Sequence, residues 1–589
     1  MDLGILFLLA LALRLAYVAD NRASVTFSSP LVDAWTYDQE ARAVAAHGLG
    51  AIEVPFYQPP VYPLLLAAVY AATGGSYLAP RLLQALLGAL TVLLVAWIAG
   101  RAAGRRAGWI AGGLLAAYGP VIYFEGELLP PALLLALLAG ALALLPLAHD
   151  APRRTSRIAA AGVLLGVATA ARPTTLLFAA GAAGWLVRIA RSRREGLREA
   201  ALLAAAVALP VLPFTITNYL RGNEPILVSW NGGLNFYLGN GAGSDSLTAI
   251  QPGYAWDKLQ VEPFRAGVRA SRRAESAYWT HRALREAAAD PLAWAESLGR
   301  KALRFVGTRE TPRNTDYQDF RRDSWVLSCP LVGFGVVLPL ALLGLLLGFA
   351  PPGPAAPALR ALLAIDVAAV AAENLLFFVA DRYRLEAVPA LCVLAGLGVE
   401  AALRRRGRIG LVPGAVLVAG AALTHVDFLH EWRIDETRAA IHRAVALQHA
   451  GLEESSAQAL RTALRWGPND VDAHRLLGDH FERARNLPAA IAEFDRALDR
   501  APDYLEALLA KAACLERLGR AAEAEPLFAK ALQADPYSGR VRLLYGVHLA
   551  MQKRYPEARK QFETGAVLDP GNQDLRANLA NVDRLIRGS

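Results

Sequence analysis

The 589-residue chain contains few cysteines and no stretch that matches a nucleic-acid-binding motif. Its three cysteines, Cys329, Cys392 and Cys514, lie far apart without metal-ligand spacing, so neither a disulfide framework nor a zinc site is indicated. The net charge of +9 comes mostly from arginines between apolar blocks. Such charge orients membrane segments, and we do not interpret it as a surface for RNA or DNA.

The first apolar segment also lacks a basic start and a convincing cleavage site, so we interpret it as a retained anchor rather than a signal peptide. Hydrophobic residues make up 54% of the chain, and the mean hydropathy is +0.29. Soluble domains are less apolar. The excess lies before about residue 425, and the remainder has the composition of a soluble domain.

The apolar part predicts a polytopic helical bundle of about eleven spans, since a span needs about 20 apolar residues. The candidates are 3–19, 78–100, 107–123, 128–147, 158–171, 174–189, 200–216, 331–350, 361–380, 387–402 and 409–423. The segment 61–72 is too short to cross and is expected to lie in the interface.

Arginine clusters in the short loops all fall on one side if the N-terminus is cytoplasmic. This orientation places outer loops 20–77 and 218–330, and the C-terminal part, outside the cytoplasmic membrane. Acidic and aromatic residues gather on the same outer side. We therefore expect the active site there.

The part after His430 is periodic. Proline recurs every 34 residues, and alanine and phenylalanine keep the same step; the positions are Pro468, Pro502, Pro536, Pro570, Ala490, Ala524, Ala558, Phe494, Phe528 and Phe562. A 34-residue unit with these positions resembles the tetratricopeptide repeat. The sequence thus predicts an all-α protein, with a membrane domain over 1–425 and a repeat α-solenoid over 431–589.

Two carboxylates, Asp33 and Asp38, follow the first span at the membrane surface. A short amphipathic helix is expected there, with Thr36 and Gln39 as its capping box, which would leave Asp33 free ahead of the helix. Asp33 could instead be the N-cap. Asp38 is expected to be the structural acid of the first turn, although the two roles could be exchanged. Their spacing makes no compact metal-ligand pair, so no metal is predicted.

Several segments in the membrane half carry a resemblance to a known superfamily. They are Asp33, the interfacial helix with Tyr37 and Arg42, PPVYPLLLAAVY (59–70), FEGELL (124–129), ARPT (171–174) and DRYRLEAVP (381–389). In this order they resemble the GT-C glycosyltransferases, near the protein O-mannosyltransferases (family 39) and the enzyme that transfers aminoarabinose to lipid A. With the repeats, the layout also resembles a eukaryotic group of O-mannosyltransferases. The resemblance implies a polyprenyl-phosphate sugar as donor and an acceptor on the outer face.

The chemistry of glycosyl transfer suits these residues. The acceptor hydroxyl needs a carboxylate base, for which Asp33 is the candidate, and a nearby anion stabilises the oxocarbenium-like transition state. Arginine is the natural partner of the leaving phosphate. Arg382 and Arg384 are expected to clamp it, or else to form local salt bridges, and Arg172 has the same two interpretations.

Other candidates are less direct. The family has an acid in the second outer loop, and the resemblance assigns it to Glu127, although Glu127 could be an ordinary interfacial acid. Asn235, Tyr237 and Asn240 lie in a glycine-rich stretch that could bind substrate or form a structural turn. Asp366, inside a predicted span, is expected to pair with Arg360 or with another span.

We predict an inverting membrane glycosyltransferase that uses a polyprenyl-phosphate sugar and an outer protein or glycolipid acceptor. Asp33 is the base, Glu127 or Asp38 assists, and Arg382 with Arg384 holds the phosphate. The repeats are expected to recruit the acceptor or a protein partner. Two alternatives share the layout: a lipid-linked oligosaccharide polymerase or ligase, and a non-catalytic scaffold or transporter. The size of the product distinguishes a polymerase or ligase from a transferase of single sugars. Substitutions of Asp33 and Arg384 without any effect on activity would indicate a scaffold or transporter.

Overall fold

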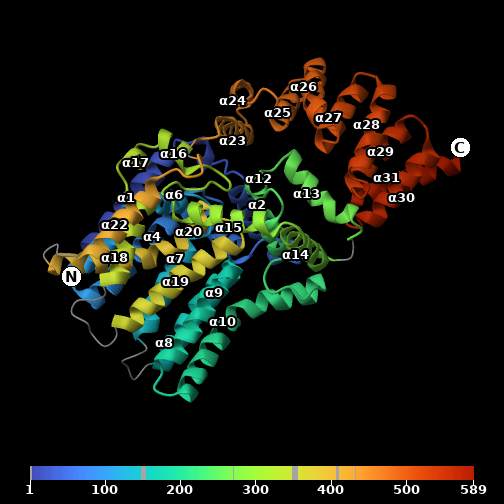
Figure 1. Cartoon of the computed structure of the whole chain (residues 1–589). Coiled ribbons are helices and arrows are strands. Elements are labelled where there is room, and N and C mark those ends of the chain that lie inside the picture. The colour runs from blue at the N-terminus through green and yellow to red at the C-terminus, as the bar shows by residue number, and fades with distance from the viewer. Residues whose placement is uncertain are drawn as a thin grey trace. The chain divides into compact units, whose positions relative to one another are not determined.

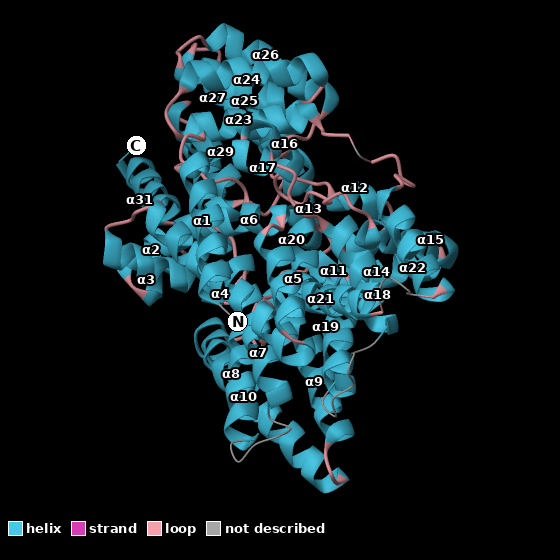
Figure 2. Ribbon diagram, turned by 90° about the vertical axis from the view of Figure 1, so that its left-hand side faces the viewer, coloured by secondary structure: helices cyan, strands magenta, loops and turns pink. Residues whose placement is uncertain are grey.

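The computed structural model describes residues 3–147, 154–268, 271–347, 356–405, 410–431 and 433–588. Within these ranges the helices are joined by turns and loops, and there is no β-strand (Figure 2). The predicted all-α class is confirmed. The chain divides into two compact units, Met1–Ala249 with Ala270–Ile434, and Ile250–Arg269 with Asp435–Ser589.

The first unit holds the apolar helices. Those at predicted spans are α1 (Leu3–Asn21), α4 (Leu78–Ala103), α5 (Arg105–Ala116), α6 (Gly119–Gly126), α7 (Pro131–Leu147), α8 (Arg154–Ala171), α9 (Leu176–Ile189), α10 (Arg193–Gly222), α18 (Phe334–Leu347), α19 (Ala356–Leu376), α21 (Val388–Arg404) and α22 (Leu411–His425).

The remaining helices of this unit lie between the apolar ones. They are η1 (Val25–Phe27), α2 (Asp33–His47), η2 (Leu49–Ala51), α3 (Val61–Thr73), η4 (Pro173–Thr175), α11 (Gly232–Asn240), α12 (Ser244–Thr248), α14 (Arg272–Ala289), α15 (Pro291–Val306), α16 (Tyr317–Asp323), α17 (Trp325–Ser328), α20 (Asp381–Arg384) and η5 (Leu385–Ala387).

Among the described helices, four are long and apolar enough to cross a membrane: Leu3–Asn21, Leu78–Ala103, Arg193–Gly222 and Asp381–Arg404. Shorter apolar helices of 10–17 residues are Val61–Thr73, Pro131–Pro146, Pro173–Ile189, Phe334–Leu347 and Leu411–His425. The segment predicted as one span over 107–123 is two helices, α5 and α6, because the chain breaks at residues 117 and 118 and Pro120 then lies in the first turn of a new helix. The total number of spans remains a prediction.

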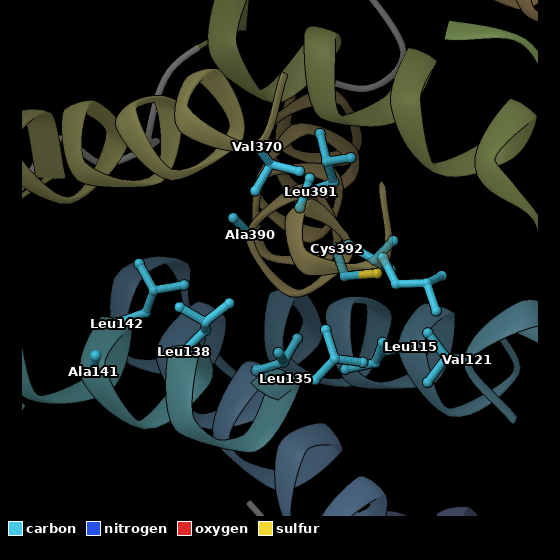
Figure 3. Close-up of a cluster of buried hydrophobic side chains, with 14 of the residues drawn as sticks. Leu115, Val121, Leu135, Leu138, Ala141, Leu142, Val370, Ala390, Leu391 and Cys392 are labelled. Atoms are coloured by element: carbon cyan, nitrogen blue, oxygen red, sulfur yellow. The ribbon is translucent and has the colours of Figure 1, made fainter. Parts of the chain in front are cut away.

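Helix α21 lies at the centre of the first unit and packs against α4, α5, α18 and α19. Its residues Ala390, Leu391 and Cys392 belong to the same buried cluster as Leu138 and Leu142 of α7 (Figure 3). Glycines allow the close contact with α18, since a Cβ on Gly344 would lie 2.0 Å from the carbonyl oxygen of Leu394. The rigid core therefore includes the helix that follows α20, and α20 carries the candidate arginines.

The second unit is a series of paired helices, coloured orange to red in Figure 1. They are α23 (Glu436–His449), α24 (Glu453–Trp466), α25 (Val471–Arg483), α26 (Leu487–Arg500), α27 (Leu505–Arg517), α28 (Ala521–Ala534), α29 (Gly539–Met551), α30 (Tyr555–Leu568) and α31 (Gln573–Gly588), joined by α13 (Tyr254–Arg265).

Small and aromatic residues fit each helix pair together as the repeat predicts. A Cβ on Gly478 would lie 2.5 Å from the ring of Phe494, and Gly546 has the same relation to Phe562. The predicted α-solenoid is confirmed. One segment departs from the predicted division: α13, from the loop 218–330, belongs to the compact unit of the repeats.

Candidate active site

Helix α2 presents Asp33 as its first residue. The predicted capping box is wrong, because the hydroxyl of Thr36 donates a hydrogen bond to the carbonyl of Val32 (3.3 Å) and Val32 makes no side-chain cap. Val32 adopts φ +51°, a strained value for a β-branched residue. Asp33 therefore lies in the first turn, where the helix dipole favours its ionised form.

Asp33 pairs with Arg382 of α20, 349 residues further along the chain. Its Oδ2 lies 2.5 Å from Nη2 of Arg382, and the side chains are 25% and 10% exposed, respectively. The structure thus brings together the predicted base and one predicted phosphate ligand. The carboxylate keeps contact with solvent, as a base that meets a substrate must.

The pair is enclosed by side chains from three parts of the chain. Tyr37 lies one turn after Asp33 on the same face of α2, and Arg382 donates a hydrogen bond to the hydroxyl of Tyr383 (3.2 Å). Burial raises the pKa of Asp33, but Arg382 and a hydrogen bond from Asn314 outweigh it, so that this pKa is lower than usual. Asp33 is therefore ionised at neutral pH.

Arg382 retains a hydrogen-bond donor that its neighbours do not use. Its Nε is buried and has no hydrogen-bond partner within the described part of the chain. A buried N–H without a partner is costly unless a ligand supplies an acceptor. The guanidinium geometry, with Nη2 on Asp33 and Nε unused, suits an additional anionic oxygen such as that of a phosphate.

Arg172 also packs on the ring of Tyr383, with its guanidinium carbon 3.7 Å from the ring centre. It forms ion pairs with Glu373 (3.1 Å) and Glu386. Two carboxylates already balance its charge. Arg172 therefore positions Tyr383 in this arrangement, and it makes no contact with Asp33.

Asp38 and Arg42 form a separate cluster on another face of α2. Asp38 is fully buried and accepts hydrogen bonds from Tyr70 (2.6 Å), Tyr77 (3.2 Å) and Arg42 (3.0 Å). It lies in the second turn of α2, not in the first turn as predicted. These partners lie on α2 itself, on α3 and just before α4, so the geometry favours a structural role for Asp38 and Arg42.

Glu127 is the C-cap residue of α6 and is connected to Tyr62 through Gln84. Its carboxylate accepts a hydrogen bond from Asn21 (3.5 Å), and its carbonyl accepts one from Gln84, which in turn accepts one from Tyr62 (2.5 Å). Tyr62 packs edge-on against Tyr37, 5.4 Å between ring centres. Burial raises the pKa of Glu127. Glu127 thus reaches the site only through intervening side chains.

Arg384 does not join the site. It is buried and donates hydrogen bonds to Glu310 (2.6 Å) and to the carbonyls of Phe305 (2.9 Å) and Gly307 (2.5 Å). These carbonyls lie at the end of α15, where a cation is stabilising. The predicted clamp of two arginines is therefore not formed, because Arg384 fastens α15 to α20.

The glycine-rich stretch with Asn235, Tyr237 and Asn240 is a helix, α11, and not the predicted turn. Its glycines permit close packing, since a Cβ on Gly239 would lie 1.6 Å from the carbonyl oxygen of Phe377. Asn240 donates a hydrogen bond to the carbonyl of Leu376 (2.7 Å).

Tyr237 of α11 stacks on Trp279, with 4.6 Å between ring centres. Asn235 is half-buried on the same helix. Neither Tyr237 nor Asn240 contacts Asp33 or Arg382, and both hold α11 against its neighbours.

The expected partner of Asp366 is also wrong. Arg360 donates a hydrogen bond to the carbonyl of Leu345 (3.4 Å). Asp366 is fully buried, and neither carboxylate oxygen has a hydrogen-bond partner among the described residues.

Sequence reasoning missed Arg313, Asn314 and Tyr383. Arg313 is close enough to Asp33 to lower the pKa of that carboxyl, and Arg313 itself has a lowered pKa because of its burial. Arg313 and Asn314 lie between α15 and α16, outside any helix. No periodic pattern marks such residues, and only the spacing of aromatic and basic residues in DRYR (381–384) could have indicated Tyr383.

The helical membrane unit and its acid–arginine pair define the class: a membrane protein whose site suits glycosyl transfer. Residues 57–216 match the family described as dolichyl-phosphate-mannose-protein mannosyltransferase. Residues 443–504, 483–539 and 515–582 match tetratricopeptide-repeat families. The chain therefore combines a segment similar to this membrane-embedded glycosyltransferase family with C-terminal repeats of the tetratricopeptide type. The matched region includes Glu127 and Arg172, whereas Asp33 and Arg382 lie outside it.

Among curated proteins, the chain is similar to Hsp70-Hsp90 organizing protein 2 of Arabidopsis thaliana, 28% identical over 110 residues. It is also similar to Hsp70-Hsp90 organizing protein of Triticum aestivum, 26% identical over 110 residues. Each match covers 19% of this chain and 19% of the relative. The chain thus spans about a fifth of the length of these relatives.

Among solved structures, MamA from Desulfovibrio magneticus RS-1 is 18% identical with a TM-score of 0.25, covering 26% of this chain and 87% of that one. YrrB, described as a TPR protein with an unusual peptide-binding site, is 20% identical with a TM-score of 0.24, covering 26% and 79%. These likenesses concern the repeat fold alone.

Proposed function

We propose that the protein transfers a sugar from a polyprenyl-phosphate donor to an acceptor outside the cytoplasmic membrane, with inversion at the anomeric carbon. The observation that carries the proposal is the ion pair of Asp33 with Arg382, whose guanidinium keeps Nε without a partner in the described chain. The match of residues 57–216 to the mannosyltransferase family supports the same reaction class. Mannose is the first sugar to test.

In the proposed reaction, the acceptor oxygen attacks the anomeric carbon and forms the new glycosidic bond. The bond between that carbon and the phosphate oxygen breaks, and the polyprenyl phosphate leaves with the electron pair. The acceptor proton passes to Asp33. The partial exposure of Asp33 gives the acceptor a path to its carboxylate.

Arg382 connects donor binding to the activity of the base. Its charge keeps the pKa of Asp33 low and so makes Asp33 a weak base in the unliganded protein. A donor phosphate that bonds to Nε would share the positive charge of Arg382. The pKa of Asp33 then rises toward its ordinary value, and Asp33 becomes a better base only when the donor is bound.

The repeats are proposed to lie on the extracytoplasmic side and to bind a protein partner, which could be the acceptor. The family match supports a membrane protein, and the repeat matches support protein binding. The N-terminus is proposed to be cytoplasmic, as the arginine-rich loops favour.

The test uses purified full-length protein and a panel of polyprenyl-phosphate sugars, with the consumed donor and the product size as readouts. Asp33→Asn is expected to lower the turnover by about 100- to 10,000-fold, the usual contribution of a general base. Arg382→Lys is expected to raise the donor KM, because a lysine lacks the planar guanidinium that bonds Asp33 through Nη2 and offers Nε to a second anion.

Glu53→Gln is the matched control, since Glu53 is 75% exposed and makes only a weak surface pair with Arg272. Its activity is expected to stay unchanged. Full activity of Asp33→Asn would refute the assignment of the base. Oligosaccharide-sized products would favour a polymerase or ligase, and no donor consumption by the wild-type protein would favour a scaffold.

A further inference from the structure

Helix α13 (Tyr254–Arg265) comes from the loop between α10 and α18, yet it belongs to the compact unit formed by the repeats (Figure 1). It is a 12-residue helix in which Leu259 and Pro263, one turn apart, are buried. A short amphipathic helix is stable only when its apolar residues, here Leu259 and Pro263, pack against another element. Its contacts within the unit identify that partner.

The N-terminal half of α13 is fixed on the repeats by three polar contacts. The backbone N–H of Tyr254 donates to Oδ1 of Asp472 (3.0 Å), and its hydroxyl donates to Oδ1 of Asp503 (2.5 Å). Lys258 forms an ion pair with Asp503 (3.2 Å). The ring of Tyr254 also packs on that of Tyr504, 5.2 Å between centres.

The repeat residues that receive α13 are themselves held in place. The hydroxyl of Tyr504 donates to Asp472 (2.7 Å) and accepts a hydrogen bond from Arg475 (2.8 Å). Asp472 lies in α25, and Tyr504 directly precedes α27, so two successive repeats form one rigid surface. A preorganised surface loses little entropy when a ligand binds.

Gly253 gives independent evidence of a fitted contact. Its φ is +139°, and a Cβ at this position would lie 2.4 Å from Oδ1 of Asp472. Only glycine meets both conditions. At the other end of α13, Arg265 donates a hydrogen bond to the carbonyl of Ala534, at the end of α28. Contacts therefore extend from α25 to α28.

We propose that the surface formed by Asp472, Asp503, Tyr504 and the end of α28 is the ligand-binding surface of the repeat array, and that α13 is its resident internal ligand. The surface recognises a helix that begins with Gly-Tyr and carries a lysine one turn later. A protein partner can bind this surface only after it displaces α13. The proposal depends on contacts within the repeat unit and not on transferase activity.

The first experiment measures amide hydrogen exchange of the full-length protein in detergent. Wild-type residues 254–265 are expected to be protected. Tyr254→Ala is expected to speed their exchange at least tenfold, and Asp503→Ala is expected to do the same. The control Ala255→Ser changes an exposed residue of the same helix and should leave the protection unchanged. Unaltered protection of α27 verifies that the repeats remain folded.

The second experiment uses a fluorescent peptide of residues 250–268 as the probe. It is expected to bind the full-length Tyr254→Ala, Leu259→Asp variant at least tenfold more tightly than the wild type, where α13 occupies the surface. Adding Asp472→Ala and Asp503→Ala should abolish that binding. Equal exchange of residues 254–265 in the wild type and Tyr254→Ala would overturn the proposal. Equal peptide binding by the wild type and the Tyr254→Ala, Leu259→Asp variant would overturn it as well.

Discussion

Arg384 offers the sharpest test of how the two arginines of α20 are divided between structure and catalysis. It forms a buried ion pair with Glu310 (2.6 Å), and both side chains are at most 2% exposed. It also caps the carbonyl end of α15. The substitution Arg384→Met keeps the volume and removes the charge, which leaves Glu310 buried without its cation.

Breaking a buried ion pair in this way costs about 3–5 kcal/mol. The carbonyls of Phe305 and Gly307 lose their donor as well, at about 1–3 kcal/mol each if they stay dry. We therefore expect Arg384→Met to lower the apparent Tm in detergent by several degrees. The double variant Arg384→Met, Glu310→Met removes both charges and is expected to recover part of the loss.

The assay combines thermal unfolding with donor KM on the same preparations. If Arg384 is structural, the double variant regains stability and turns over the donor with a KM close to that of the wild type. If Arg384 binds the donor phosphate, Arg384→Met instead stays stable and loses donor binding, and the double variant is folded but inactive. That second pattern would refute the reasoning.

Two further predictions follow from single contacts. Gly239→Ala should lower the apparent Tm, because the new Cβ would meet the carbonyl of Phe377 and overpacking costs about 1–3 kcal/mol. The control Gly232→Ala lies on the same helix, where a Cβ meets nothing within 4 Å, and it should leave the Tm unchanged. Equal effects of the two substitutions would contradict this packing of α11. Burial, Glu506 and Asp472 raise the pKa of Asp257 to about 6, against the opposite effect of Arg475 and Arg540, so the docked state of α13 holds the proton more tightly. The docking equilibrium of α13 should weaken, by less than tenfold per pH unit, as the pH rises from about 4 to 6, and should then stay constant. Asp257→Asn should remove this pH dependence from the hydrogen exchange of residues 254–265. A pH dependence that persists in this variant would assign the titration to another group.

The fold was largely predictable because its signals are periodic. Apolar blocks gave the helices of the membrane unit, and the 34-residue step of Pro468, Pro502 and later prolines gave the repeats. The break between α5 and α6 was missed, since Gly119 and Pro120 lie within an apolar block whose hydropathy is continuous. The docking of α13 could not be predicted, because contacts between distant segments leave no periodic trace.

The site was predictable only where residue type was decisive. An acid after the first span and arginines at an outer boundary are rare enough to be noticed, and Asp33 and Arg382 do meet. The helix start was misplaced, because the cap residue is Val32, which has no capping side chain. Asn314 and Arg313 escaped notice since they lie in irregular structure, where no spacing rule applies.

Helix geometry alone could have separated Arg382 from Arg384. Positions two apart on a helix differ by about 200° in direction, so both side chains cannot meet one phosphate. The structure follows this rule: Arg382 reaches Asp33 on one side of α20, and Arg384 reaches Glu310 on the other. The same rule separates Asp33 from Asp38, five positions apart, and places Tyr37 with Asp33 instead. Adjacent charged residues in a membrane-boundary motif should therefore be assigned by helical face before they are assigned a shared ligand.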